Sequence, residues 1–160
     1  MIMNSDEKFM RLALEQAHLA YKMGEVPVGA VVVRNGEVVG TGYNRRETDK
    51  NAVAHAELLA IDDACKRLGG WRLWECELYV TLEPCPMCAG AIINSRIKRL
   101  VYGASDKKAG SVESIVRMFD LPYNHKPPYT AGVLEEECSQ ILKSFFKEMR
   151  SRKSRVESEE

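Results

Sequence analysis

Two short groups of residues have types and spacings that could do chemistry. The first is His55-Ala56-Glu57, and the second, 28 positions after Glu57, is Cys85-Pro86-Met87-Cys88. Because residues three apart lie on one side of a helical turn, the two cysteine sulfurs can hold a single ion. Zinc prefers thiolate and imidazole ligands, and His55 with the two cysteines supplies three of them. A structural zinc site would need a fourth protein ligand, so the pattern predicts an open site with one Zn²⁺ per chain.

Glu57 adds a group that can move protons. Zinc can lower the pKa of a bound water from 15.7 toward ~7, so hydroxide becomes available at neutral pH. Glu57 is expected to stay outside the ligand set, where its carboxylate takes the proton from the water. It would pass this proton to a ring nitrogen and then to a departing amine, which cannot leave as an amide anion. The residues therefore predict hydrolytic deamination of an amino-substituted heterocycle.

Both groups fall at the N-termini of predicted helices. Aligned peptide dipoles place roughly half a positive charge at such an end, which stabilises thiolates. On an ideal helix His55 and Glu57 would point about 200° apart, at 3.6 residues per turn. The two side chains can therefore converge only if His55 lies at the end of the first turn and outside its regular geometry.

Apolar periodicity predicts alternating helices and strands that would position these residues. We expect a helix over 6–23 capped near Ser5 or Asp6, and a hairpin around Asn35-Gly36. Helices are also predicted over 54–68, 84–93, 112–119 and 134–149, and strands over 26–33, 38–43, 78–82 and 99–102. In the last helix, Leu142, Phe145, Phe146 and Met149 are expected to face inward. Strands alternating with helices indicate a layered α/β domain.

Length and composition favour one folded domain. The chain has 160 residues, of which 45% are hydrophobic and 29% charged, which excludes disorder and low complexity. We expect a single domain over 1–150 and a frayed, charged tail over 151–160. The longest apolar run falls well short of the ~18 residues of a membrane span, and the first residues have no secretory pattern. Five cysteines, an odd number, fit a reducing cytoplasm.

Overall charge excludes a strongly basic protein but hides local differences. There are 23 Lys and Arg against 23 Asp and Glu, so the net charge gives no sign of a nucleic-acid partner. Between residues 143 and 155, however, six basic residues accompany only Glu148, which gives 6 − 1 = +5. This segment is either a solvated helix end or a phosphate-binding patch.

The pattern His-x-Glu followed by Pro-Cys-x-x-Cys is the signature of zinc deaminases that act on bases. Around it stand Val26-Pro27-Val28-Gly29-Ala30-Val31, the run 78–83 and Asn124-His125. With these motifs the chain, over most of 6–150, resembles the bacterial-type tRNA-specific adenosine deaminases of the cytidine and deoxycytidylate deaminase superfamily. The resemblance implies a cytidine deaminase-like three-layer α/β/α sandwich with a five-stranded mixed sheet, and a homodimer. It also implies conversion of adenosine to inosine at the wobble position, in the tRNA anticodon loop.

The resemblance also assigns individual residues. It gives His55, Cys85 and Cys88 as zinc ligands and Glu57 as the catalytic proton shuttle. Asn44 resembles the asparagine that hydrogen-bonds the target base, and Val28 resembles a position in the pocket wall beside it. Asp106 resembles a residue near the sugar of the substrate strand. In Phe145-Phe146-Lys147 a lysine stands where relatives often have arginine, and lysine lacks the planar guanidinium that makes a planar contact to RNA.

Several alternatives remain open from the residues alone. The cysteine pair could be a thioredoxin-like redox motif, although this leaves His55 and Glu57 unexplained. It could also be part of a structural zinc site, although neither Cys65 nor Cys76 forms a second spaced pair. The same zinc chemistry would serve a deaminase of free nucleobases or nucleosides, of the guanine or cytosine type. A non-catalytic zinc module that binds RNA is a further possibility. His125 is either an ordinary loop residue or a substrate contact.

Overall fold

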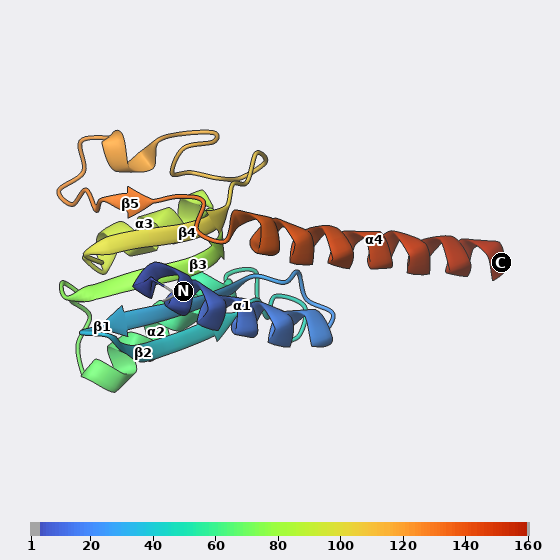
Figure 1. Cartoon of the computed structure of the whole chain (residues 1–160), viewed down its shortest axis with the longest axis horizontal. Helices are drawn as coiled ribbons and strands as arrows, with labels where there is room; N and C mark the ends of the chain where they lie inside the picture. The colour runs from blue at the N-terminus through green and yellow to red at the C-terminus, as the bar shows by residue number, and fades with distance from the viewer. Residues whose placement is uncertain (1–3, 160) are drawn as a thin grey trace.

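Five strands form one mixed sheet in the order β2-β1-β3-β4-β5 (Figure 1). The computed structural model describes residues 4–159, with side chains as far as 158. The strands are β1 (Gly29–Arg34), β2 (Glu37–Tyr43), β3 (Cys76–Leu82), β4 (Arg99–Ala104) and β5 (Tyr129–Thr130). Strand β1 is antiparallel to both β2 and β3, whereas β4 is parallel to β3 and to β5.

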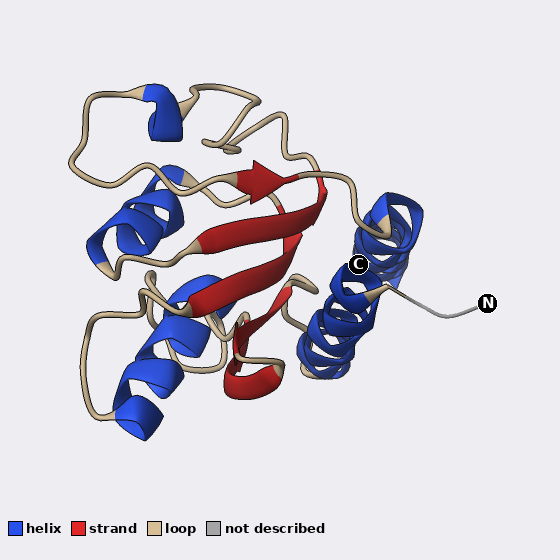
Figure 2. Ribbon diagram, turned by 60° about the vertical axis from the view of Figure 1, so that its left-hand side comes forward, coloured by secondary structure: helices blue, strands red, loops and turns tan. Residues whose placement is uncertain are grey.

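In the described part of the chain, four α-helices cover the two faces of the sheet. They are α1 (Ser5–Lys22), α2 (Ala56–Leu68), α3 (Pro86–Asn94) and α4 (Glu135–Glu159). Helices α1 and α4 lie side by side on one face, and α2 and α3 cover the other (Figure 2). This three-layer α/β/α arrangement around a five-stranded mixed sheet confirms the expected fold class.

Strand β1 shows why the sheet needs helices on both faces. Ala30 and Val32 belong to the core beneath α2 and α3, whereas Val31 and Val33 belong to the core beneath α1 and α4. Successive side chains of a strand point to opposite faces, so a continuous apolar run is buried on both sides. The apolar sequence of β1 thus requires the two helical layers.

Four strands, β2, β3, β4 and β5, end at the same edge of the sheet, since β5 runs parallel to β4. Strands β2 and β3 are both antiparallel to β1, so they run in one direction, and β4 runs with them. The segments that follow β2, β3 and β4 therefore meet at one edge, together with the segment that precedes β1. Helices α2 and α3 also begin at this edge, because they follow β2 and β3 along the chain. In α/β sheets, this carboxyl edge is where ligands bind.

Close backbone packing fixes the start of α2 against β2. A side-chain carbon at Gly42 would collide with the carbonyl oxygen of Ala56 and the amide nitrogen of Ala60. Only glycine permits this approach, because it has no Cβ. The contact holds the first turn of α2, which carries Glu57 and follows His55, at a fixed height over the sheet.

The segment 112–119 was predicted to be a helix, and this prediction is wrong. It forms turns that lead into a short 3₁₀ helix, Met118–Asp120. The amide groups of Val112, Glu113 and Ser114 donate to the carboxylate of Glu83, at 2.9–3.1 Å. These three amides would be free first-turn donors in a helix too, so the difference lies in the next residues. The amides of Ile115 and Met118 donate to the carbonyls of Gly110 and Ser111, five and seven residues earlier, and not to the carbonyls four residues earlier that an α-helix uses.

The chain ends also differ from the predictions. Helix α1 is capped by Asn4, whose side chain accepts a hydrogen bond from the amide of Glu7, and not by Ser5 or Asp6. Helix α4 continues to Glu159, ten residues beyond the predicted end at 149, so 151–159 has helical structure. Phe145 is buried, but Phe146 and Met149 are 44% and 43% exposed and do not face the core. Residues Met1–Met3 and Glu160, parts of the predicted domain and tail, lie outside the described residues.

None of the helices in residues 4–159 is both long enough and apolar enough to cross a membrane. Even α4, the longest at 25 residues, carries charged side chains along most of its length.

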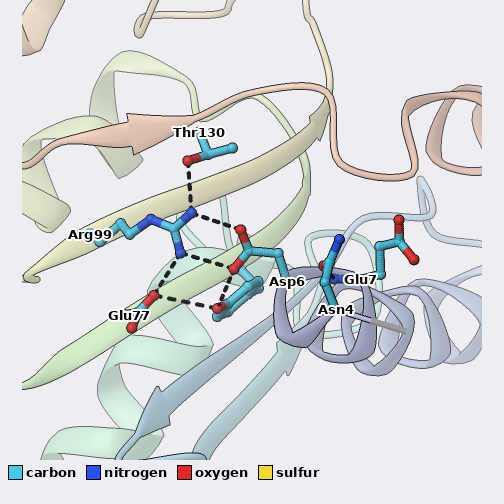
Figure 3. A network of polar contacts seen from close by, with 7 residues as sticks. Asn4, Asp6, Glu7, Glu77, Arg99 and Thr130 are labelled. Atoms are coloured by element: carbon cyan, nitrogen blue, oxygen red, sulfur yellow. Dashed lines mark hydrogen bonds and ion pairs between the residues drawn. The ribbon is translucent and has the colours of Figure 1, made fainter. Parts of the chain in front are cut away.

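An arginine-centred network ties α1 to the edge of the sheet opposite the carboxyl ends of β2, β3 and β4 (Figure 3). Arg99 donates to Asp6 at 2.7 and 2.9 Å, to Glu77 at 2.9 Å and to Thr130 at 2.7 Å. The hydrogen bond from Arg99 is the main cause that lowers the pKa of Asp6 below its ordinary value of 3.8. One side chain thus joins α1, β3, β4 and β5.

Replacing Asp6 by Asn should lower the free energy of unfolding by about 1–3 kcal/mol near neutral pH. The folded-state pKa of Asp6 is depressed, so its contribution is present above pH 3.8 and is lost as the pH falls through the folded value. Urea unfolding of both proteins, at neutral pH and well below pH 3.8, measures this difference. A gap between the two proteins that stayed constant at low pH would contradict the assignment.

Candidate functional site

His55, Cys85 and Cys88 come together at the carboxyl edge of the sheet. The Nδ1 atom of His55 lies 3.7 Å from the sulfur of Cys85 and 3.6 Å from that of Cys88. The three ligand atoms all lie within 4.8 Å of one another. The structure thus brings together the three predicted ligands, from segments about 30 residues apart in the sequence.

Helix starts place these three side chains. His55 is the N-cap of α2 and has extended backbone angles, φ −85° and ψ 149°. Cys85 is the N-cap of α3, and Pro86 follows it in the first turn, where the missing N–H costs nothing. Cys88 lies in the same first turn. Both helices therefore direct the positive ends of their dipoles at the site, which favours thiolate and other negative charge there.

Charge is shared unequally within this group. A hydrogen bond from Cys88 is the main cause that lowers the pKa of Cys85 to about 4, and His55 adds to it. The hydrogen bond with Cys85 raises the pKa of His55 above its ordinary value. The hydrogen bond between Cys88 and Cys85, together with burial, raises the pKa of Cys88. Binding a cation to all three atoms would therefore release protons from His55 and Cys88.

The donor set fits zinc. One imidazole and two thiols are the ligands that Zn²⁺ prefers, and three protein ligands are typical of catalytic zinc sites. Within residues 4–159, this is the one group of His, Cys, Asp or Glu residues with metal-binding spacing. No fourth protein ligand belongs to it, so the predicted open site is consistent with the geometry, and a four-ligand structural site is not.

Glu57 lies beside the metal-binding group but is not part of it. Its side chain is only 4% exposed. Burial is the main cause that raises its pKa to about 7, and the negative charge of Cys85 adds to the effect. Because His55 is the N-cap and not a helical residue, the two side chains can reach the same cavity, as the sequence required. A carboxyl group with this pKa can both accept and donate a proton near neutral pH.

His55, Glu57 and Cys85 line a cavity of about 720 Å³. Its walls come from the segments after β2, β3 and β4, from the segment before β1 and from α4. The lining residues are Gly24, Glu25, Val26, Val28, Asn44, Arg46, Glu47, His55, Glu57, Leu82, Glu83, Cys85, Asp106, Ala109, Phe145, Phe146 and Met149. The cavity therefore spans both the metal-binding group and the exposed side of α4.

All three predicted substrate contacts lie in this lining. The side-chain oxygen of Asn44 accepts from the amide of Ala56 at 2.9 Å, and its NH₂ group donates to the carbonyl of Val26 at 3.1 Å. Val28 is 4% exposed and presents an apolar wall. The carboxylate of Asp106 accepts from the amide of Lys108 at 3.0 Å. Asn44 is thus held rigidly, with one N–H still available to a ligand.

Sequence reasoning missed two buried acids that line the same cavity. Glu25 and Glu83 are each 2% exposed, yet both accept several hydrogen bonds from backbone amides. The sequence did offer a signal, since each acid adjoins an apolar run, at Glu25-Val26 and Leu82-Glu83. An acid drawn into the interior by such a run needs hydrogen-bond partners, because acids are seldom fully buried without them. The exposed Phe146 and Met149 were also misplaced in the core.

His125, in contrast, does not line the cavity. Its Nε2 atom lies 2.7 Å from the carbonyl oxygen of Ile97, which precedes β4 at the opposite edge of the sheet. The other three cysteines, Cys65, Cys76 and Cys138, are free and lie outside the metal-binding group.

Known proteins share this arrangement. The family model of the MafB19-like deaminases matches residues 4–150. The tRNA-specific adenosine deaminase of Bacillus subtilis (strain 168) is 49% identical over 152 residues, which cover 94% of each chain. A structure solved in studies of A-to-I editing by tRNA:A34 deaminases at the wobble position has a TM-score of 0.82 and 48% identity, and the match covers 84% of this chain and 99% of that one.

A deaminase of a free base has the same fold at lower identity. The guanine deaminase from Nitrosomonas europaea has a TM-score of 0.75 and 26% identity, and the match covers 91% of this chain and 86% of that one. The higher identity to the tRNA-specific enzymes confirms the resemblance found in the sequence. With a family model that matches almost the whole described chain and a metal-binding group of deaminase type, this chain belongs to the MafB19-like deaminase family.

Proposed function

We propose that this protein is a zinc-dependent hydrolase that converts adenosine to inosine at the wobble position of tRNA. One observation carries the proposal: His55, Cys85 and Cys88 form a zinc-type donor set, with the buried Glu57 beside them in one cavity. The enzyme of Bacillus subtilis with 49% identity, named a tRNA-specific adenosine deaminase, indicates the substrate.

Zinc, when bound by His55, Cys85 and Cys88, supplies Lewis-acid activation of water near neutral pH. Glu57 is the group that moves protons in this scheme. Its carboxylate accepts a proton from the attacking water, donates it to a ring nitrogen and assists proton transfer to the departing amino group. One C–O bond forms and one C–N bond breaks, so water is consumed and ammonia leaves. The pKa of about 7 suits Glu57 to both halves of this transfer.

The remaining lining residues position the base. Asn44 would donate its free N–H to the base, because its other polar atoms are already occupied by Ala56 and Val26. Val28 would pack against the flat face of the ring, and Asp106 would lie near the sugar of the substrate strand. A base in this cavity must leave its stack, which is easier from a single-stranded loop than from a duplex.

Helix α4 favours RNA over a free base as the substrate. Phe146 and Met149 line the cavity and also a second hollow along α4, which includes Arg150 and Lys153. The cavity thus opens onto the basic segment 143–155 of α4, a helix that extends beyond the sheet (Figure 1). Of the six basic residues between 143 and 155, one, Arg152, forms an ion pair within the described chain, with Glu148 at 2.9 Å. The unpaired cations suit phosphate groups.

Two further expectations belong to this proposal. The family resemblance implies a homodimer. The five free cysteines fit a protein that works in a reducing cytoplasm.

Incubation with tRNA, and separately with free guanine, cytosine and adenosine, tests the substrate. We expect inosine in the anticodon loop of the tRNA and no turnover of the free compounds. Nucleoside analysis of digested tRNA measures inosine, and ammonia release measures turnover of free guanine, cytosine and adenosine. Consumption of a free base without inosine in any tRNA would instead identify a deaminase of the guanine or cytosine type.

Glu57→Gln should abolish turnover while the protein still binds zinc and RNA. The amide keeps the shape of the side chain but cannot shuttle a proton, so we expect a loss of about 10²–10⁴-fold in rate. Elemental analysis should still find one zinc per chain, and RNA affinity should stay near that of the unmodified protein. A non-catalytic zinc module would bind RNA equally well and show no turnover before or after the change. A deamination rate that the change leaves unaltered would overturn the role proposed for Glu57.

Lys147→Ala or Arg150→Ala should weaken RNA binding and reduce the slope of log affinity against log salt by about 1 each. The rate at saturating RNA should stay unchanged, because neither residue touches the reacting atoms. Lys98→Ala is the matched control, since this exposed lysine precedes β4 at the opposite edge. Binding at several salt concentrations measures the slope, and equal slopes in all four proteins would show a merely solvated helix end.

A further inference from the structure

Two buried carboxylates of the cavity, Glu25 and Glu83, lie outside the metal-binding group and have no part in the proton transfer described above. We propose that they are positioning residues: each fixes one loop of the cavity and so determines how tightly the substrate strand is bound. The proposal rests on the proposed function, since it concerns the same cavity. It is argued from the hydrogen bonds that each carboxylate accepts.

Glu83 holds the loop that follows β4. One carboxylate oxygen accepts from the amide of Asp106 at 3.1 Å and from the hydroxyl of Ser114 at 2.5 Å. The other accepts from the amides of Val112, Glu113 and Ser114, at 2.9–3.1 Å. Five donors from residues 106–114 thus converge on one side chain. There is no room for a side-chain carbon at Gly110, because the Glu83 carboxylate occupies that space.

Glu25 holds the loop that follows β2 in the same way. One of its oxygens accepts from the amide of Glu47 at 3.1 Å. The other accepts from both the amide and the hydroxyl of Thr48, each at 2.6 Å. Arg46 and Glu47 of this loop line the cavity, as Asp106 and Ala109 of the other loop do. Each carboxylate therefore lies beneath one lining loop and is joined to its backbone.

The hydrogen bonds assign these acids a positioning role and not a role in proton transfer. Their oxygens already accept three donors at Glu25 and five at Glu83, so little acceptor capacity remains for a substrate proton. Neither forms an ion pair with Lys or Arg in the described chain, so backbone amides balance the buried charge. A glutamine would place an NH₂ group against some of these amides and release the loop.

The experiment uses Glu83→Gln and Glu25→Gln, with the milder Ser114→Ala and Thr48→Val, each of which removes one hydroxyl donor. Single-turnover deamination of tRNA, measured against enzyme concentration, separates the half-saturating concentration from the maximal rate. We expect the half-saturating concentration to rise roughly tenfold in the glutamine variants and about two- to fourfold in the hydroxyl variants. The maximal rate and the zinc content should stay close to those of the unmodified protein.

Asp6→Asn is the matched control, because it breaks a charged network at the opposite edge of the sheet. It should lower stability without changing the half-saturating concentration, provided that enzyme concentrations are expressed as folded protein, because unfolded protein would raise the apparent value. If the glutamine variants do not fold, the hydroxyl variants carry the test. An unchanged half-saturating concentration in every folded variant would overturn the proposal.

Hydrogen exchange separates this proposal from the proposed function, because it needs no turnover. The amides of 47–48 and 112–114 should exchange slowly in the unmodified protein and at least tenfold faster in the variant of the carboxylate that binds them. Absence of inosine with the unmodified enzyme would reject the proposed function alone. Fast exchange at these amides in the unmodified protein would reject the positioning role alone.

Discussion

The site depends on the common direction of β2, β3 and β4. Because these strands run the same way, the segments that follow them reach one edge of the sheet, where α2 and α3 also begin. Asn44, Cys85 and Asp106 are far apart in sequence, yet each lies in one of these three segments. Reversal of one strand would move its residues to the far edge. Strand direction thus decides which side chains can meet before any chemistry is considered.

Helix starts and burial then give the site its electrostatic character. The exposed amides of α2 and α3 favour negative charge at Cys85 and Cys88. Glu57 lies in the first turn of α2, but burial raises the pKa of its carboxyl and opposes that effect. Two acidic residues of the same cavity behave differently: hydrogen bonds from hydroxyl and amide donors together outweigh burial and lower the pKa values of Glu25 and Glu83. Hydrogen-bond donors, more than burial alone, separate the acid proposed to transfer protons from those proposed to hold loops.

Much of this could be predicted from the sequence because local patterns determine it. The His-x-Glu and Pro-Cys-x-x-Cys spacings identified the metal ligands, and apolar periodicity located α1, α2, α3 and four of the five strands. The errors occurred where distant residues decide. Segment 112–119 has helical periodicity, but Glu83, about 30 positions earlier, holds its first amides, and the amides that follow do not make the four-residue hydrogen bonds of an α-helix. Strand β5 has only two residues and exists by pairing with β4. Phe146 follows the apolar period of α4, yet it faces the cavity and not the core.

The buried carboxylates also bear on where conformational entropy is lost. Loops whose amides are already bound to Glu25 and Glu83 are ordered when the protein folds, so little further ordering remains when a ligand arrives. The cavity is then preorganised, and the conformational change on binding falls mainly on the RNA. An RNA loop that can present an unstacked base cheaply is favoured over one that cannot. Selection among RNAs can therefore arise from the deformability of the nucleic acid, without a separate contact for every nucleotide.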